Sequence, residues 1–158
     1  MLECLKELVS NEVLLVALSG WLTSQIIKFI INLIVERKFD FQRLFGDGGM
    51  PSGHSAMVSA LATMCSIKFG FGSIYFAITA VLALIVMHDA LGVRREAGKH
   101  AVSIKELAEA FNKTFTGETD KIRTENLKIF VGHTPLQVIL GAILGVSIAC
   151  IYSFLIKG

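Results

Sequence analysis

Cysteine, proline and charge are all scarce in this chain of 158 residues, which has three cysteines, two prolines and a charged fraction of 18%. The cysteines show no metal-like spacing, and Cys65 and Cys150 lie in apolar segments. We therefore expect buried thiols and no disulfide framework. Aspartate and glutamate do not cluster at metal-ligand spacing either, so the sequence predicts neither a metal site nor a cofactor.

Other common signals are also missing. The N-terminal segment has no basic stretch and no small-residue cleavage site, so we expect no cleaved signal peptide. The sequence shows no internal repeat, which disfavours a transporter built from inverted repeats of broken helices. The net charge of +2 gives no reason to expect a nucleic-acid partner. The length is that of one domain, covering residues 1–158.

What the chain has instead is apolar sequence, with a hydrophobic fraction of 53% and a mean hydropathy of +0.64. Segments 13–35, 71–87 and 136–156 are each near the ~20 residues that a membrane crossing needs. A further apolar segment, 56–67, is short and can span only if the turn at 51–54 lies at depth in a protein-lined cavity. We therefore predict an all-α fold, a small polytopic membrane helix bundle of about four spanning helices.

The long connection over 88–135 carries its own pattern. Ser103 and Glu106 form a capping box, which predicts the start of a helix. Apolar residues come after it at helical spacing: Ile104, Leu107, Ala108, Phe111 and Phe115. Such an amphipathic helix lies on the membrane surface, covers the site as a lid or packs on its own bundle.

Charge predicts the orientation. Four crossings would put 36–53 and 88–135 on one side, and these two segments hold most of the lysines and arginines. The positive-inside rule then makes that side the cytoplasmic face of a bacterial cytoplasmic membrane.

Polar residues interrupt the first apolar segment on one helical face. Gln25, Lys28, Asn32 and Glu36 succeed one another at steps of three, four and four residues. A lysine within a span is costly and usually faces a bundle interior or a polar cavity. A lysine that merely snorkels to the interface needs no aligned amides. The stripe therefore predicts that Lys28 faces a functional cavity.

Two histidines each precede an apolar segment and are flanked by glycine and proline. His54 ends the string Gly-Gly-Met-Pro-Ser-Gly-His, and His133 lies in Gly-His-Thr-Pro. A helix N-terminus exposes backbone N–H groups and the positive end of the helix dipole, which suits a phosphate. Two such junctions predict one phosphate held between an acid and a nucleophile. His88 and His100 lack this setting and are interpreted as structural.

The end of apolar segment 71–87 adds three charged candidates, Asp89, Arg94 and Arg95. Adjacent arginines at a membrane boundary are ordinary topology anchors, but their planar guanidinium groups also match phosphate oxygens. Asp89 could pair with an arginine or orient a histidine, as a carboxylate does in catalytic triads. Both interpretations of Asp89 stay open.

Together these residues resemble the type 2 phosphatidic acid phosphatase superfamily, and more closely its divergent bacterial branch of small membrane proteins. Residues 51–54 match the Pro-Ser-Gly-His motif of that family without change. The segment from His133 resembles the family's histidine helix, with Gly141 and Gly145 in place. Gln137 departs from the pattern, because the family has aspartate there.

The basic motifs of the family fit less strictly. Lys28 matches the lysine of the first motif, with either Arg37 or Arg43 as its partner. The arginine expected just before the histidine is missing. Arg94 and Arg95 are its obvious substitutes, brought in by an insertion of roughly thirty residues, a loop length that is usually functional.

A rival alignment pairs Arg94 with His100 at the family's literal spacing. The residue four past His100 is Ile104, and the segment after it is not a spanning helix. We prefer His133, because a nucleophile needs a rigid helix to hold it against the other histidine motif.

The resemblance implies metal-independent hydrolysis of a lipid phosphate through a phosphohistidine. His133 would attack the phosphorus, and His54 would protonate the departing alcohol and then activate water. Gln137 would fix the tautomer of the nucleophile, and Asp89 or Glu125 would supply the missing carboxylate. The substrate oxygens would be bound by Lys28, Ser52, Gly53, Arg94, Arg95 and Arg43.

The expected substrate is a lipid phosphate in the bilayer, phosphatidylglycerophosphate or phosphatidate if the site faces the cytoplasm. One alternative is a catalytically inactive lipid- or anion-binding membrane protein, and another is a polyprenyl diphosphate phosphatase. Because four helices barely enclose a site, the sequence is compatible with a homodimer.

Overall fold

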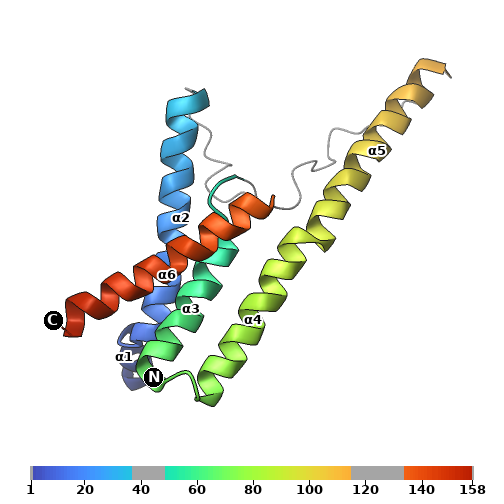
Figure 1. The fold of residues 1–158 in the computed structure, drawn as a ribbon. Coiled ribbons are helices and arrows are strands. Elements are labelled where there is room, and N and C mark those ends of the chain that lie inside the picture. The colour runs from blue at the N-terminus through green and yellow to red at the C-terminus, as the bar shows by residue number, and fades with distance from the viewer. Residues whose placement is uncertain (1, 37–48, 115–133, 158) are drawn as a thin grey trace.

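The structure, a computed structural model, describes residues 2–36, 49–114 and 134–157, and this part of the chain is helical without strands (Figure 1). Each of the four predicted apolar segments forms one helix, so the predicted all-α membrane bundle is confirmed. In chain order the helices are α1 (Leu2–Val9), α2 (Glu12–Glu36), α3 (Gly53–Phe69), α4 (Ile74–Leu91), α5 (Val93–Thr114) and α6 (Pro135–Lys157).

Three helices are long and apolar enough to cross a membrane, over Glu12–Ile34, Ile74–Leu91 and Pro135–Ile156. The remaining apolar helix, α3, has 17 residues, which corresponds to about 26 Å at the rise of an α-helix. Within the described ranges the number of candidate spans is therefore three and not the four that the sequence predicts. The fourth apolar segment forms the central helix of the bundle.

α3 contacts α2, α4 and α6, and its contacts with α6 are the most extensive. Small residues form these interfaces. The buried Ala56 and Ala60 of α3 lie between Gly20 of α2 and Gly145 of α6. A methyl group added at Gly20 would lie 3.0 Å from the Ala56 carbonyl oxygen, and one added at Gly145 would overlap the same oxygen. Close approach of small residues is how helices associate in lipid, where apolar surface alone gives no driving force.

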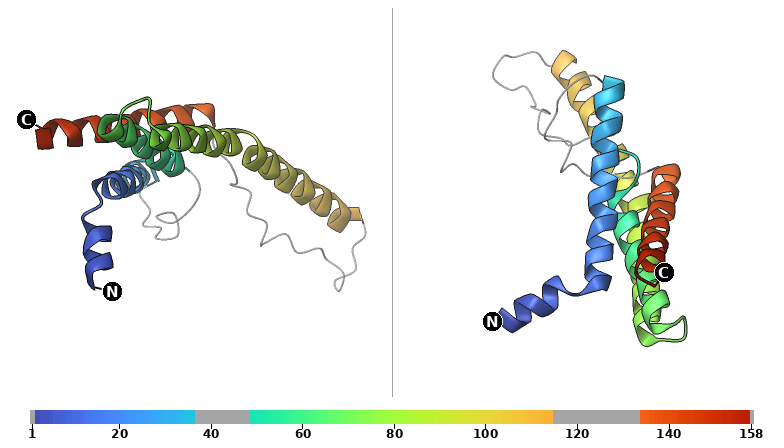
Figure 2. Two further views of the ribbon diagram at one scale, coloured as in Figure 1. Left: turned by 90° about the horizontal axis from the view of Figure 1, so that it is seen from below. Right: turned by 90° about the vertical axis from the view of Figure 1, so that its left-hand side faces the viewer.

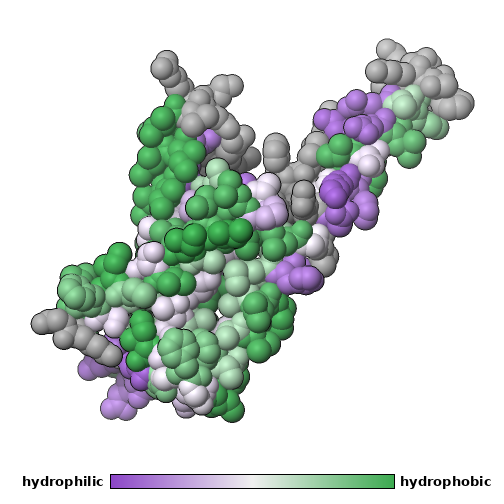
Figure 3. Space-filling model, viewed as in Figure 1, coloured by the Kyte–Doolittle hydropathy of each residue, from purple (hydrophilic) through white to green (hydrophobic). Residues whose placement is uncertain are grey.

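Large apolar side chains lie on the outside of the bundle. Figure 3 shows apolar surface over α2, α4 and α6 and hydrophilic residues along α5. Examples of exposed apolar residues are Leu22, Ile30, Leu84, Ile85, Ile139 and Ile143. Small residues inside and large apolar residues outside fit a protein whose solvent is the bilayer.

Helix α5 begins at Val93, ten residues before the start that the capping box at Ser103 predicts, so the predicted start is wrong. Segment 93–114 contains no proline, so nothing prevents α5 from starting directly after the end of α4. α5 continues the direction of α4 away from the bundle, and α4 is the described helix that it contacts (Figures 1 and 2). Among the described helices it contacts none of α2, α3 and α6. A position on the membrane surface stays a prediction.

Helix α1 was not predicted. Leu2, Leu5 and Leu8 recur at helical spacing, and all three side chains are exposed. The helix turns sharply away from α2 (Figure 2).

Candidate functional site

The Pro-Ser-Gly-His motif forms the start of α3. Ser52 is the N-cap residue, with extended backbone (φ −66°, ψ 120°), and its Oγ accepts a hydrogen bond from the Ser55 N–H at 3.4 Å. The Ser55 hydroxyl donates to the same oxygen at 3.0 Å, and both side chains are fully buried. The Ser52 hydroxyl oxygen thus caps the N-terminus of α3.

Two backbone N–H groups in the first turn of α3 have no acceptor among the described residues. The Ser52 N–H donates to the Gln137 carbonyl oxygen at 2.9 Å, and the Ala56 N–H donates to the Ser52 carbonyl oxygen at 3.0 Å. The N–H groups of Gly53 and His54 lie in the turn where a helix offers no internal acceptor. Within the described ranges no residue accepts a hydrogen bond from either group. These are the donors that an anion could use.

Helix α6 begins beside the motif. Thr134 and Gln137 form a reciprocal capping box, in which Gln137 Oε1 accepts from the Thr134 N–H at 2.9 Å and Thr134 Oγ1 accepts from the Gln137 N–H at 3.4 Å. One turn later, a methyl group added at Gly141 would overlap the Ser52 carbonyl oxygen and lie 3.0 Å from Ser55 Cβ. The first turns of α3 and α6 are therefore in backbone contact.

Helix α2 contacts the motif on its other side. A methyl group added at Gly53 would lie 2.9 Å from Ser24 Oγ and 3.2 Å from Trp21 Cδ1. A methyl group added at Gly49 would lie 3.8 Å from Cγ and Cδ of Lys28. Gly49 has φ +91°, a conformation that favours glycine. The stem of Lys28 thus lies beside Gly49, two residues before the motif, and its role at the site stays a prediction.

The motif lies at depth along α2. Ser24, which is level with Gly53, stands 12 residues after Glu12 and ten before Ile34, the two ends of the candidate span. Figure 1 shows α2 continuing well past the start of α3. If α2 spans the bilayer over this range, the turn at 51–54 lies at depth, which is the condition under which the short segment 56–67 can span.

The arginine candidates lie near the same end. α4 ends at Leu91, and Asp89 is partly buried in its last turn. Arg94 and Arg95 belong to the first turn of α5, and their side chains are outside the described part of the structure. Figures 1 and 2 show the start of α6 beside the later half of α4, and these two helices are in contact.

Several predicted residues fall outside the described ranges, namely His133, Arg43, Arg37 and Glu125. The structure brings together Lys28, Ser52, Gly53, His54 and Gln137, from three helices. His100 is exposed on α5, which leads away from the bundle.

Sequence reasoning missed the contacts of Ser24, Ser55 and Gly20 with their neighbouring helices. Small residues at one-helical-turn spacing, as at Gly20 and Ser24, were the available signal for such packing. No three His, Cys, Asp or Glu side chains among the described residues are grouped so that they could hold a metal ion.

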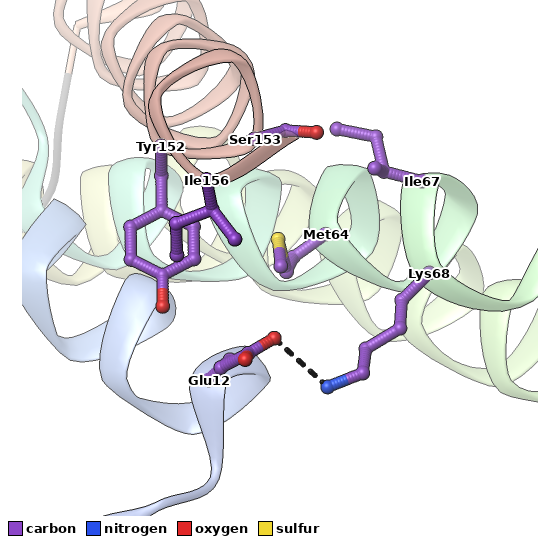
Figure 4. A pocket seen from close by; sticks show the side chains of 7 residues that line it. All are labelled: Glu12, Met64, Ile67, Lys68, Tyr152, Ser153 and Ile156. Atoms are coloured by element: carbon purple, nitrogen blue, oxygen red, sulfur yellow. Dashed lines mark hydrogen bonds and ion pairs between the residues drawn. The ribbon is translucent and has the colours of Figure 1, made fainter. Parts of the chain in front are cut away.

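A hollow lies near the C-terminal end of α3, at the opposite end of this helix from the motif (Figure 4). It has a volume of about 160 Å³ and is lined by Glu12, Met64, Ile67, Lys68, Tyr152, Ser153 and Ile156. Lys68 Nζ and Glu12 Oε2 pair across its mouth at 2.9 Å.

The similarity to known proteins covers all the residues of the candidate site. Residues 9–148 match the family described as the Divergent PAP2 family. The chain is also similar to YuiD of Bacillus subtilis (strain 168), described as an uncharacterized membrane protein. The two are 38% identical over 154 residues, which cover 94% of this chain and 98% of the relative. No solved structure matches the chain. The family match includes α2, α3, α4, α5 and the first half of α6.

Proposed function

The chain belongs to the divergent PAP2 family, and from this premise we propose that it is an integral membrane lipid phosphate phosphatase that acts through a phosphohistidine. One observation carries the proposal, the 2.9 Å hydrogen bond from the Ser52 N–H to the Gln137 carbonyl oxygen. It joins the first turns of α3 and α6, the two helices that come after the histidine motifs. His54 and the segment that carries His133 thus lead into neighbouring helix ends.

The proposed reaction has two steps. First, a ring nitrogen of His133 bonds to phosphorus and the bond from phosphorus to the alcohol oxygen breaks, while His54 gives its proton to that oxygen. Second, His54 takes a proton from water, the water oxygen bonds to phosphorus and the phosphorus–nitrogen bond breaks. Free phosphate leaves, and both histidines return to their starting state.

Positive groups stabilise the charge of the transferring phosphoryl group. Lys28, Arg94 and Arg95 neutralise its oxygens, and the N–H groups of Gly53 and His54 donate to them. Asp89 is the carboxylate proposed to pair with an arginine or to orient the nucleophile. Arg43 is the proposed partner of Lys28.

The proposed substrate is a phosphate monoester of a membrane lipid at the cytoplasmic leaflet, phosphatidylglycerophosphate or phosphatidate. The depth of the motif favours a ligand that is already in the bilayer. If α3 crosses the bilayer as a fourth helix, segments 36–53 and 88–135 share one side, and because they hold most of the basic residues the positive-inside rule would make that side the cytoplasmic one.

Release of phosphate from short-chain phosphatidate and phosphatidylglycerophosphate by the full chain in detergent tests the proposal. His54→Ala should lower the rate about 10²–10⁴-fold, as the loss of a general acid does. His133→Ala should abolish the phosphoprotein intermediate, which acid-labile, base-stable labelling from a radioactive substrate detects. His88→Ala is the matched control, and its rate should equal that of the wild type.

Two results would count against the proposal. If His100→Ala removes the labelled intermediate and His133→Ala does not, the rival alignment is correct and the nucleophile is misassigned. Wild-type protein that releases no phosphate from any lipid ester of the panel would refute the hydrolase itself.

A second candidate function is a lipid phosphate-binding protein without catalysis. It is favoured by Gln137, which stands where the resembled family has aspartate and whose Oε1 caps the start of α6. An amide cannot stabilise an imidazolium as a carboxylate does, and loss of that charge lowers the rate ~10⁴-fold in the serine-protease template. Binding of lipid phosphates without turnover would support this function.

A further inference from the structure

One buried polar atom near the motif has no hydrogen-bond partner. The Gln25 side chain on α2 is 7% exposed, and within the described part of the chain no donor reaches its Oε1. A buried carbonyl oxygen without a donor loses its hydration and gains nothing in exchange, which makes such atoms rare in native structures. An orphan of this kind needs an explanation.

The position of Gln25 on α2 shows what it faces. Trp21, Gln25 and Lys28 stand at positions i, i+4 and i+7 and so share one face of the helix. Trp21 Cδ1 lies 3.2 Å from a methyl group placed at Gly53, and the Lys28 stem lies 3.8 Å from one placed at Gly49. One end of the row therefore lies beside Gly53 of the motif and the other beside Gly49, just before it. Gln25 stands between them on the same helical face.

The other polar groups at this place are donors. Lys28 carries an ammonium group, and the N–H groups of Gly53 and His54 have no acceptor among the described residues. A phosphate satisfies donors with its bare oxygens. The Gln25 carbonyl oxygen can only accept a hydrogen bond, so a ligand that pairs with it must bring a donor, and on a phosphate compound that donor is a hydroxyl.

We propose that Gln25 is a specificity residue whose carbonyl oxygen accepts the hydroxyl hydrogen of a bound phosphate compound. The inference rests on the proposed function, whose phosphate site it refines. The hydroxyl is either the protonated oxygen of a phosphate monoester or an alcohol group beside the phosphate. A phosphodiester without any hydroxyl leaves Gln25 unpartnered and binds more weakly. The site thus selects monoesters over diesters.

Titration calorimetry of the full chain in detergent tests this with two anions of equal charge. At a pH of about 5, below the second ionisation of phosphate, dihydrogen phosphate carries hydroxyl hydrogens and dimethyl phosphate carries none. Gln25→Leu should weaken the binding of dihydrogen phosphate about tenfold, the size expected for one hydrogen bond. Its affinity for dimethyl phosphate should equal that of the wild type.

Two further ligands identify the source of the hydrogen. Weaker binding of both ethyl phosphate and glycerol phosphate to Gln25→Leu assigns the hydrogen to the phosphate oxygen. Weaker binding of glycerol phosphate alone assigns it to an alcohol group of the head group. Thr23→Val, which removes a hydroxyl from another face of α2, is the control and should change neither affinity.

Three outcomes would overturn the inference. The first is equal affinity of wild type and Gln25→Leu for every ligand. The second is equal weakening for dimethyl phosphate, since the amide would then be donating its N–H group. The third is a wild type that binds none of these anions.

Stability and activity separate the remaining explanations. Gln25→Leu replaces an unsatisfied buried amide with an apolar group of similar size, so its thermal unfolding midpoint should equal or exceed that of the wild type. A lower midpoint would mean that Gln25 supports the fold, and would also overturn the inference. Because the titrations need no turnover, a wild type that binds phosphate without hydrolysing it refutes the proposed function alone.

Discussion

The two ends of α3 are held by different kinds of contact. At the start, buried serines and close glycines bring the backbones of α3 and α6 together, as at Ser52 and Gly141. At the other end, Lys68 and Glu12 form an ion pair while 42% and 40% exposed, beside a hollow of about 160 Å³. Aromatic rings gather there too, and the ring centroids of Phe69 and Tyr75 lie 4.7 Å apart with the rings tilted by 41°.

This difference shows where the protein needs precision. Backbone contact leaves no room for adjustment, so the start of α3 keeps its position relative to α2 and α6. Flexible charged and aromatic side chains at the far end adjust to the polar boundary of a membrane. The end that carries the histidine motif is therefore the rigid one, as the proposed phosphoryl transfer would require.

The substitution expected to have the largest effect on stability is Gly141→Ala. The added methyl group overlaps the Ser52 carbonyl oxygen, so α6 must move away from the motif. We expect a loss of about 3 kcal/mol in the free energy of unfolding, at the upper end for overpacking, measured by thermal unfolding in detergent. Gly72→Ala, where the methyl group meets open space, should change it by less than about 0.5 kcal/mol. Equal unfolding midpoints for the two variants would contradict the rigid contact.

A second test compares the same helix cap at both ends of the bundle. Ser52 caps α3 and Ser73 caps α4. Ser52→Ala should lower stability by about 2 kcal/mol, because it removes a cap and leaves the buried Ser55 hydroxyl without its acceptor. Ser73→Ala should lower it by about 1 kcal/mol or less. Chemical denaturation of both variants measures the difference, and a larger effect at Ser73 would reverse the comparison.

The capping box at the start of α6 gives a smaller effect. Gln137→Ala should lower stability by about 1 kcal/mol, because the Thr134 N–H loses its acceptor. Gln137→Glu should retain it, since a carboxylate also accepts from that N–H and is favourable at a helix N-terminus. If Gln137→Glu preserves the unfolding midpoint and raises the rate of phosphate release, the residue has a catalytic part besides its cap. A midpoint as low as that of the alanine variant would rule out the cap.

The smallest effect belongs to the far end. Lys68→Ala breaks an exposed ion pair and should change the free energy of unfolding by about 0.5 kcal/mol or less. High salt should remove even this difference, which denaturation with and without added salt would show. A loss comparable to that of Gly141→Ala would mean that both ends of α3 are equally rigid.

Much of the bundle could be predicted from the sequence. The four apolar segments lie within a few residues of α2, α3, α4 and α6, because spanning length and hydrophobicity are local properties of the chain. The number of spans could not be predicted as well. Whether 56–67 crosses the membrane depends on its neighbours, and only the packed structure places it among three longer helices.

The capping rule succeeded at one helix and misled at another. Ser103 and Glu106 have the pattern of a box, but the helix is already formed from Val93, so Ser103 lies in its interior. Thr134 and Gln137 have the same pattern and do form the box. The sequence resemblance interpreted Gln137 as a replaced aspartate instead. A capping pattern is informative where proline and a change of composition mark the boundary, as Pro135 does here.

The sequence indicated some of the residues that meet at the start of α3, and their roles stay predictions. The spacing of Gln25 and Lys28 indicated a polar face, and the Lys28 stem lies beside Gly49, just before the motif. The sequence could not show that the Ser52 oxygen is occupied by two hydrogen bonds, because these depend on the local turn. It also could not show the orphan carbonyl of Gln25, which depends on what surrounds it.

The level at which α3 begins has an electrical consequence. Gly53 lies near the midpoint of the candidate span of α2, so an anion held there has passed through part of the voltage drop across the membrane. Half of a 100 mV potential changes the free energy of a unit charge by about 1 kcal/mol. If the motif faces the cytoplasm and binds an anion, as proposed, an interior-negative voltage would draw that anion into the site and retard its exit, so occupancy would follow the energised state of the cell.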